Sequence, residues 1–418
     1  MNAVARRKSD PGRLLVSVVM LFFFSAFILI ALKDNPLQWR SFLLAVAVPA
    51  TLWVGTMVLP KMCPADKLLL TLTNFLCALG VLILYSTDHE RGLQQAVYYA
   101  AGIPCMLICI LLVRWIKTRW KWPVRLMLPV SLLMLALPLV IGRETNGAKN
   151  WFYVGGLSVQ PSEIVKLSLL LILSHYMSRR KMLPWLFFSV CCLGLLMLQK
   201  DLGTALMYFF TTLLLFYAST SNLPLTLLGL GGGAGAAILG YKMFAHVKVR
   251  VAIWRNPWSD YEGSGFQIIQ SLMAIASGGF FGMGLGLGEP KVIPVYYTDM
   301  IFAVICEQFG IIFGLCVLLV YVAILWRGFT IAMSARYSML ALLAMGVTAI
   351  IGIQTFVIIG GVIKLIPLTG VTMPFVSYGG TSLVSSLCLI GLLQGVASLN
   401  EDDLKEDARL ASIGSEQL

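Results

Sequence analysis

Charged side chains are scarce in this chain of 418 residues. Asp, Glu, Lys and Arg together make up 12% of it, and there are only three histidines. A soluble domain carries roughly 25% charged residues, so this chain lacks the polar surface that a water-soluble fold needs. Hydrophobic residues make up 59%, and apolar runs of about 20 residues, long enough to cross a bilayer, recur along the chain. The composition excludes the soluble classes and predicts an all-α polytopic integral membrane protein.

The sequence also lacks cysteine pairs spaced for disulfides or zinc sites, and it lacks a nucleotide-binding glycine motif. The nine cysteines lie in apolar runs or in one short basic loop, and no polar segment holds a suitably spaced pair. The glycine run at 278–288 lacks a preceding strand and a G-K-[ST] sequence, so it indicates loop flexibility or close packing. The net charge of +12 is explained by Lys and Arg that orient a membrane protein. No nucleic-acid partner is therefore expected.

Twelve apolar stretches are expected to form membrane helices. They are followed by an acidic C-terminal segment, which is expected to be a frayed, solvated end. Basic residues precede the first stretch, and no small-residue cleavage site follows it, so it is interpreted as a retained helix rather than a signal peptide. The twelve stretches are 14–32, 41–60, 68–86, 94–113, 126–142, 162–178, 184–199, 203–219, 224–242, 300–326, 338–363 and 382–398.

The distribution of basic residues predicts the orientation. If the chain alternates sides from its N-terminus, 18 of the 31 Lys and Arg residues fall on the side of the N-terminus. Because Lys and Arg are enriched in cytoplasmic loops, both termini are expected in the cytoplasm. The long polar loop at 243–299 and the loops at 143–161 and 364–381 are then expected on the outer face, as one working surface.

Four carboxylates lie within or beside the apolar stretches: Glu163, Asp201, Asp299 and Glu307. An ionisable group at membrane depth is costly, so each is a candidate functional residue. The alternative for Asp201 and Glu307 is a buried ion pair or a carboxylate that faces a wet cavity. Asp299 opens a helix and could simply cap it, yet its place beside the long outer loop suits a base that meets a lipid-borne substrate.

Glu163 and Lys166 stand one helical turn apart after Pro161, so they share a face and can pair. A lysine at a helix start can also bind a phosphate as a point charge, helped by the positive helix end. Further cations, among them Arg250 and Arg255, occur in the long loop. The residues leave open whether Lys166 is structural or binds substrate.

Six motifs in order resemble the SEDS (shape, elongation, division, sporulation) family of RodA/FtsW polymerases. The resemblance runs from about residue 63 to 398, and the six together are far more specific than any one alone. They are N-G-A-K-N-W-F-Y-V-G-G-L-S-V-Q-P-S-E-I-V-K at 146–166, Q-K-D-L-G-T-A at 199–205, R-N-P-W at 255–258, G-S-G-F-Q at 263–267, Y-T-D-M-I-F-A at 297–303 and P-F-V-S-Y-G-G-T-S at 374–382.

The resemblance implies a helical membrane core with a large outer loop between its seventh and eighth helices. In this chain that loop follows the ninth stretch, so residues 1–62 are expected to be an N-terminal extension with two extra membrane helices. Residues 63–398 would then form a ten-helix glycosyltransferase core, and 399–418 an acidic cytoplasmic tail. An added pair of helices leaves the orientation unchanged, in agreement with the cation distribution.

Members of the family polymerise lipid II, the undecaprenyl-diphosphate-linked disaccharide-pentapeptide, on the outer face of the bacterial cytoplasmic membrane. The resemblance assigns the catalytic carboxylate to Asp299, which would take the proton of the attacking sugar hydroxyl. It leaves open a divalent cation at the diphosphate and implies no other cofactor. The substrate-binding residues that it implies are Glu163, Lys166, Lys149, Arg250, Arg255, Gln267, Ser377 and Tyr378.

Three positions depart from the family pattern. Asn150 stands where the family often has Arg, so Lys149 is expected to supply that charge, and one phosphate contact is in doubt. Tyr297 replaces a common His before the Thr-Asp pair, and Ile358 replaces a frequent Asn. None of the three removes the expected base.

Two other functions remain open. A lipid II flippase would be favoured by an internal repeat and by charges at the membrane midplane, and no repeat is visible. A ligase of another lipid-linked glycan would differ only in substrate. For the polymerase, the implied partner is a class B penicillin-binding protein, the transpeptidase with which this family works. The sequence does not decide among roles in division, elongation and sporulation.

Overall fold

The computed structural model describes residues 11–33, 38–116, 121–145, 148–154 and 157–416. Within these, the helices are α1 (Pro11–Lys33), α2 (Trp39–Trp53), α3 (Leu59–Met62), α4 (Lys67–Thr87), α5 (His89–Ile116), α6 (Lys121–Ile141), α7 (Pro161–Ser178), α8 (Met182–Leu198), α9 (Leu202–Thr220), α10 (Leu223–Met243), α11 (Ala245–Arg255), α12 (Phe266–Gly278), α13 (Ile301–Met333), α14 (Ser338–Val362) and α15 (Gly380–Glu416). A π-helical turn (Val54–Val58) joins α2 to α3, and 3-10 turns occur at Pro257–Asp260 and Pro290–Val292.

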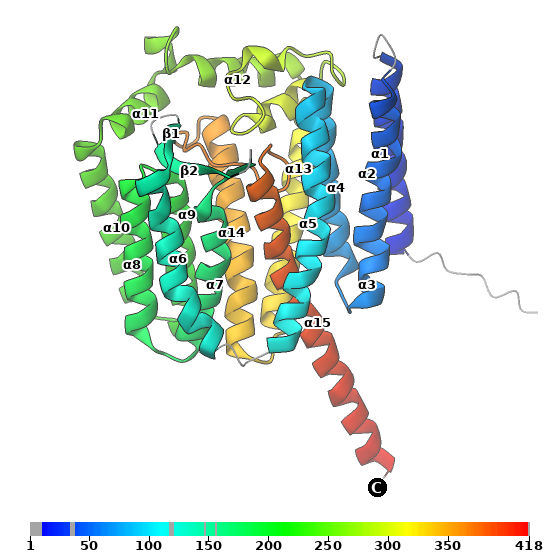
Figure 1. Cartoon of the computed structure of the whole chain (residues 1–418), viewed down its shortest axis with the longest axis vertical. Coiled ribbons are helices and arrows are strands. Elements are labelled where there is room, and N and C mark those ends of the chain that lie inside the picture. Colours follow the sequence, from blue (N-terminus) through cyan, green and yellow to red (C-terminus); the bar gives the residue numbers. More distant parts are fainter. Residues whose placement is uncertain (1–10, 34–37, 117–120, 146–147, 155–156, 417–418) are drawn as a thin grey trace, which may run out of the picture.

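All twelve expected stretches are helical, which confirms the all-α polytopic fold class (Figure 1). Ten of the described helical segments are long and apolar enough to cross a membrane. The other two expected stretches are α8, an apolar helix of 17 residues, and α7, which carries Glu163, Lys166 and His175. Most of α7 is buried, and it packs against α6, α9, α14 and α15. Its polar side chains therefore face other helices rather than lipid.

The centre of the bundle is formed by α4, α14 and the first part of α15, which are buried over most of their length. By contrast, α10 is almost entirely exposed. Gly80 shows how closely the central segments approach, because a Cβ at this position in α4 would lie 2.5 Å from the carbonyl oxygen of Val376. The segment before α15 can therefore rest directly on α4.

The N-terminal helices pack against the outside of α4. Phe23 of α1 contacts Phe75 with ring centroids 5.6 Å apart, and the Phe27 and Tyr85 rings are 6.1 Å apart. The Ser41 hydroxyl of α2 lies 2.7 Å from the Tyr85 hydroxyl, within hydrogen-bond distance. At the end of α1, the Lys33 ammonium donates a hydrogen bond to the Gly286 carbonyl in the glycine run. These contacts join the N-terminal helices to both the bundle and the long loop.

The structure adds elements that the sequence did not predict. Three short antiparallel strands, β1 (Arg143–Thr145), β2 (Ala148–Val154) and β3 (Leu157–Val159), form a sheet in the order β1-β2-β3. Parts of the first motif, at 146–147 and 155–156, lie outside the described residues. The long loop contains α11 and α12, which lie across one end of the bundle together with the sheet (Figure 1).

The prediction of a frayed C-terminal tail is wrong, because α15 continues through it to Glu416 (Figure 1). Ion pairs tie the tail to the bundle. Arg114 lies 3.1 Å from Asp402, and Arg336 lies 3.4 Å from Asp407. The tail also contains several Leu, Ala and Glu residues, which favour helix.

Candidate functional site

A polar cavity of about 270 Å³ lies where the sheet, the starts of α7 and α9, α11 and the segments before α13 and α15 meet. It brings together residues from three of the six motifs, those at 146–166, 199–205 and 297–303. We call it the polar cavity, and it is lined by Asn150, Trp151, Gln160, Glu163, Lys200, Asp201, Thr204, Met207, Arg250, Val295, Tyr297, Thr298, Asp299, Thr369, Gly370, Val371 and Thr372.

Asp299 lies in a turn just before α13 and is held by the backbone around it rather than by helix capping. The Ser377 hydroxyl donates a hydrogen bond to the Thr298 carbonyl (2.6 Å), and the Tyr378 amide donates one to the Tyr297 carbonyl (2.8 Å). Because Ser377 also accepts from the Met373 amide (2.8 Å), the 373–378 turn is fixed from within. The P-F-V-S-Y motif therefore positions the Thr-Asp pair.

Asp299 and Arg250 face each other beside Gly370. A Cβ at Gly370 would lie 3.6 Å from Oδ2 of Asp299 and 4.0 Å from Nη2 of Arg250. Nη1 of Arg250 donates to the Thr369 carbonyl (3.0 Å), which anchors the guanidinium to the segment between α14 and α15. The pKa of Asp299 is raised to about 6, because burial outweighs the Thr298 hydrogen bond and the charge of Arg250, which both lower it. Burial lowers the pKa of Arg250, while Asp299 and Asp201 raise it.

Asp201 joins three of the surrounding segments and is 8% exposed. Its Oδ1 accepts from the Thr204 amide (3.1 Å) and so caps α9, while Oδ2 accepts from the Thr204 hydroxyl (3.0 Å). The side chains of Asn150 (3.0 Å) and Gln160 (3.3 Å) also donate to Oδ2. This carboxylate lines the polar cavity but is already supplied with donors, which indicates a mainly structural role.

Glu163 and Lys166 form the ion pair that their spacing suggested, with Nζ and Oε2 2.7 Å apart. Lys166 is 1% exposed and also donates to Gln354 of α14 (3.2 Å). The Ser385 hydroxyl of α15 donates to Glu163 (2.6 Å). Glu163 lines the polar cavity, whereas Lys166 does not. The pair therefore joins α7, α14 and α15 directly behind the cavity wall.

Several of the residues expected to bind substrate lie away from the polar cavity. Lys149 and Arg255 are exposed, and Gln267 is half-buried on α12. Ser377 and Tyr378 lie behind the Thr-Asp turn rather than on the cavity wall. The sequence interpretation missed Lys200, which lines the cavity beside Asp201. The signal was present, because Lys200 is part of the Q-K-D-L-G-T-A motif.

Glu307 belongs to a different part of the molecule. Its Oε1 accepts from the Glu289 amide (3.1 Å), and the glycine run wraps around its backbone through a hydrogen bond from the Met283 amide to the Glu307 carbonyl (2.8 Å). Gly282 has φ +84°, and a Cβ there would lie 2.3 Å from the Gln308 carbonyl oxygen. The expectation that the glycines allow close packing is confirmed, and Glu307 does not line the polar cavity.

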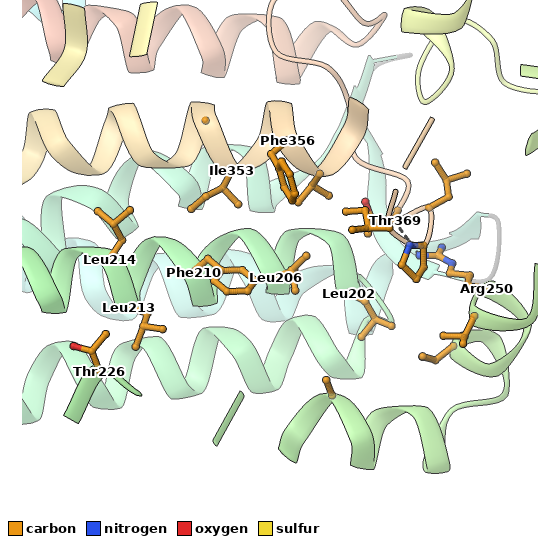
Figure 2. A pocket seen from close by; sticks show the side chains of 18 of the residues that line it. Leu202, Leu206, Phe210, Leu213, Leu214, Thr226, Arg250, Ile353, Phe356 and Thr369 are labelled. Carbon is orange, nitrogen blue, oxygen red and sulfur yellow. Dashed lines mark hydrogen bonds between the residues drawn. The ribbon is translucent and has the colours of Figure 1, made fainter. Parts of the chain in front are cut away.

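An apolar groove of about 900 Å³ begins at the polar cavity and shares Arg250 and Thr369 with it. It follows α9 from Leu202 to Tyr217, a distance of roughly 20 Å at 1.5 Å per residue. Figure 2 shows Arg250 and Thr369 at one end of the groove and the side chains of α9 and α14 along it. Residues of α10 and the 366–368 segment complete it, among them Leu223, Ala237, Ile366 and Leu368.

Among the described residues, no group of three or more His, Cys, Asp and Glu side chains is placed to hold a metal ion. In the polar cavity, Asp201 and Glu163 already have hydrogen-bond and ion-pair partners. Among the described residues, the polar cavity therefore holds no preformed cluster of metal ligands.

Comparisons with known proteins agree with the motif pattern. The family model for the cell cycle proteins FtsW, RodA and SpoVE matches residues 66–402. Peptidoglycan glycosyltransferase RodA of Mycobacterium tuberculosis is 29% identical over 94% of this chain and 90% of its own length. Stage V sporulation protein E of Bacillus subtilis is 34% identical over 79% of this chain and 96% of its own.

Solved structures share the fold. A chain in a structure titled "Structural coordination of polymerization and crosslinking by a peptidoglycan synthase complex" matches with a TM-score of 0.69 and 29% identity, covering 81% of this chain and 98% of that one. The rod shape determining protein RodA of Thermus thermophilus matches with a TM-score of 0.59, 29% identity and the same coverage.

Breaking the buried ion pair from one side should destabilise the protein. Lys166→Met leaves the Glu163 carboxylate buried without its cation, and loss of one partner of a buried pair costs about 3–5 kcal/mol. Glu163→Gln should act similarly. The double variant Glu163→Gln/Lys166→Met buries no charge and should be more stable than Lys166→Met alone, as measured by thermal unfolding in detergent.

The exposed pair of Lys405 and Glu401 (2.7 Å) supplies the control. Lys405→Met should leave the unfolding temperature unchanged, because exposed ion pairs contribute little. If the losses of the two single variants simply added in the double variant, the pair would not be coupled.

Proposed function

The chain belongs to the FtsW, RodA and SpoVE family of cell cycle proteins, and from this premise we propose that it polymerises lipid II at the polar cavity. It is a multi-pass bacterial membrane protein and a peptidoglycan glycosyltransferase. The proposal concerns its substrate, the residues that act on it and the side of the membrane on which they act.

The observation that carries the proposal is the junction of the polar cavity with the apolar groove at Arg250. A lipid-linked sugar diphosphate has a long apolar chain, a doubly charged linker and a polar sugar in that order. The groove leads to the guanidinium of Arg250 at one end (Figure 2), and Arg250 also lines the polar cavity, so the three features follow the same order. A cavity for a water-soluble sugar nucleotide would not need an apolar groove on one side.

We assign the general base to Asp299. In the reaction, a hydroxyl oxygen of the acceptor sugar forms a bond to the anomeric carbon of the donor, and the bond from that carbon to the diphosphate oxygen breaks. The hydroxyl proton passes to the Asp299 carboxylate, and the diphosphate leaves with the electron pair. A pKa of about 6 suits this role, since the group is ionised at neutral pH yet basic enough to accept a proton.

The departing diphosphate gains negative charge, which fixed cations stabilise. Arg250 is anchored through Thr369 at the mouth of the groove, and Lys200 lines the cavity beside Asp201. We propose these two residues as the diphosphate contacts. A diphosphate leaves without protonation more readily than a sugar alkoxide does, so one general base is sufficient.

The other expected site residues take supporting roles in this proposal. Glu163 lines the cavity and Lys166 fixes it from behind, so Lys166 is a positioning residue. Ser377 and Tyr378 position the Thr-Asp turn through the backbone. Lys149, Arg255 and Gln267 lie off the polar cavity and could contact only the parts of a large substrate that extend beyond it.

We further propose that the polar cavity faces outward, with both termini in the cytoplasm, and that a class B penicillin-binding protein is the partner. The cation distribution supports the orientation. The similarity to a chain of a peptidoglycan synthase complex, whose title couples polymerisation to crosslinking, supports a transpeptidase partner.

Asp299→Asn should abolish polymerisation while keeping the size and shape of the side chain. General-base catalysis contributes roughly 100- to 10,000-fold, and a loss in that range is expected. The assay is glycan formation from purified lipid II in detergent, where a transport activity gives no signal. Glu289→Gln, an exposed acid near in sequence that lies off the polar cavity, should retain activity. Folded Asp299→Asn protein with near wild-type polymer formation would exclude Asp299 as the base.

The pH profile should report the same group. Because the carboxylate is the reactive form, the rate should rise with pH through about 6 and level off above it. The charge of Arg250 lowers the pKa of Asp299, so Arg250→Gln should move this limb to higher pH as well as slow the reaction. Arg255→Gln, five residues along at the exposed end of α11, should leave the limb in place. An unmoved limb in Arg250→Gln would mean that another group titrates.

The orientation can be tested with single cysteines in a background that lacks the native nine. Ser264, before α12, and Ser338, at the start of α14, are exposed at opposite ends of the bundle (Figure 1). The cells should be intact but should allow the reagent to reach the outer face of the cytoplasmic membrane. A membrane-impermeant maleimide should then label Ser264→Cys but not Ser338→Cys. The reverse pattern would place the polar cavity in the cytoplasm and rule out polymerisation on the outer face.

A further inference from the structure

A support for the Thr-Asp turn lies outside all six motifs, at the start of α5. This helix begins at His89, and its first two turns contact the segments that lead into α13 and α15. Three polar residues orient or make these contacts, and they are Asp88, Arg91 and Gln95. None of these three described residues lines the polar cavity, so they stand outside its wall.

Arg91 stacks on the ring of Tyr297, two residues before Asp299. The guanidinium carbon lies 3.6 Å from the centre of that ring and 5.9 Å from the centre of the Tyr296 ring. A cation over the face of an aromatic ring is attracted by the quadrupole of the ring, and the planar guanidinium also stacks on it. Because Tyr297 lines the polar cavity, this contact holds a wall residue of the cavity from outside.

Asp88 directs the guanidinium of Arg91. Its Oδ1 accepts from the Arg91 amide (3.3 Å) and from the Glu90 amide (3.1 Å), and so caps the start of α5. Its Oδ2 lies 3.4 Å from Nε of Arg91. One carboxylate therefore fixes both the start of the helix and the direction of the cation.

The same helix also supports the P-F-V-S-Y turn, which positions the Thr-Asp pair. The buried Gln95 side chain donates to the Ser377 carbonyl (3.0 Å) and accepts from the Gly379 amide (3.4 Å). The rings of Tyr297 and Tyr378 meet edge to face, with centroids 5.9 Å apart. The start of α5 therefore contacts both turns beside the reacting group, and the two turns also contact each other.

We propose that Arg91 is a positioning residue for the reaction and that it acts on the Thr-Asp turn through the ring of Tyr297. This inference rests on the proposed function, in which Asp299 is the general base. A base must lie within hydrogen-bond reach of the hydroxyl that it deprotonates, and a misplacement of about 1 Å can slow a reaction about 100-fold. The contact with Arg91 keeps the Tyr297 ring, and with it the turn, in one arrangement.

The competing interpretation is that Arg91 acts by its charge alone, on Asp299 or on a bound diphosphate. The geometry favours positioning, because the guanidinium is engaged by Asp88 and by the Tyr297 ring and does not line the polar cavity. A charge effect would also change the pH dependence of the rate, whereas a positioning effect would lower the rate at every pH. The two interpretations therefore give different pH profiles.

The test is a double-mutant cycle on glycan formation by the full-length protein from purified lipid II in detergent. Arg91→Met should lower kcat about fivefold and change KM less than about twofold, since a cation–π contact at a partly exposed site contributes about that factor. In a Tyr297→Phe background, which keeps the ring, the same change should again cost about fivefold. In a Tyr297→Leu background the loss should shrink to less than about twofold, because the contact is already absent.

Arg40→Met supplies the matched control. Arg40 of α2 is a cation at the same end of the bundle, in an exposed pair 3.6 Å from Glu90, and its loss should leave kcat unchanged. Arg91→Met should unfold at the wild-type temperature, and the rising limb of its pH profile should stay in place while the plateau falls. If Arg91→Met folds poorly, Arg91→Lys keeps the charge without the planar face and should show a smaller loss in the same cycle.

Three results with an active wild-type protein would overturn this inference alone. The first is wild-type kcat in folded Arg91→Met. The second is an equal loss in the Tyr297→Leu and Tyr297→Phe backgrounds, which would exclude coupling through the ring. The third is a displaced pH limb in Arg91→Met, which would assign the effect to charge. A folded wild-type protein that forms no polymer would instead overturn the proposed function, and the inference with it.

Discussion

A charge buried in a membrane protein must find a partner, and the arrangement of the helices around the polar cavity depends on that requirement. Lys166 and Glu163 neutralise each other inside the bundle, and Gln354 and Ser385 complete their hydrogen bonds. Removing an unpaired charge from water would cost several kcal/mol. Because the partners lie on α14 and α15, this one requirement fixes α7 against both helices, and α7 forms part of the cavity wall.

The carboxylates of the cavity differ in how fully they are satisfied, and that difference separates structure from chemistry. Asp201 accepts four hydrogen bonds and Glu163 has a cation and a hydroxyl. Asp299 is instead held through its backbone neighbours and shares its surroundings with Arg250. A carboxylate that is half-buried and incompletely partnered keeps a raised pKa and a lone pair for a proton. The fold thus supplies several donors to Asp201 and to Glu163, whereas Asp299 has the Thr298 hydrogen bond and the nearby charge of Arg250.

Sequence reasoning succeeded where the signal was local. Apolar length located twelve stretches that are all helical, and the spacing of Glu163 and Lys166 predicted their contact. It failed where partners come from distant segments. For Lys166 the residues left a structural and a phosphate-binding role open, and only the structure shows that Gln354 of α14 shares its ammonium with Glu163. Lys200 was overlooked, although the cavity wall includes it. The C-terminal segment was predicted to be frayed. The prediction failed because the partners of Asp402 and Asp407 lie on α5 and just after α13, far away in the sequence.

The sequence by itself determined the membrane class, the positions of the apolar helices and the family. These follow from the length of the apolar stretches and from motifs in the linear amino-acid sequence. Only the tertiary structure decided which charged residues face the cavity and which stand behind it. Asp299, Arg250 and Gly370 come from three separate segments, and their proximity results from helix packing that no local pattern encodes. Burial and pairing, rather than residue type, set the role of each charge.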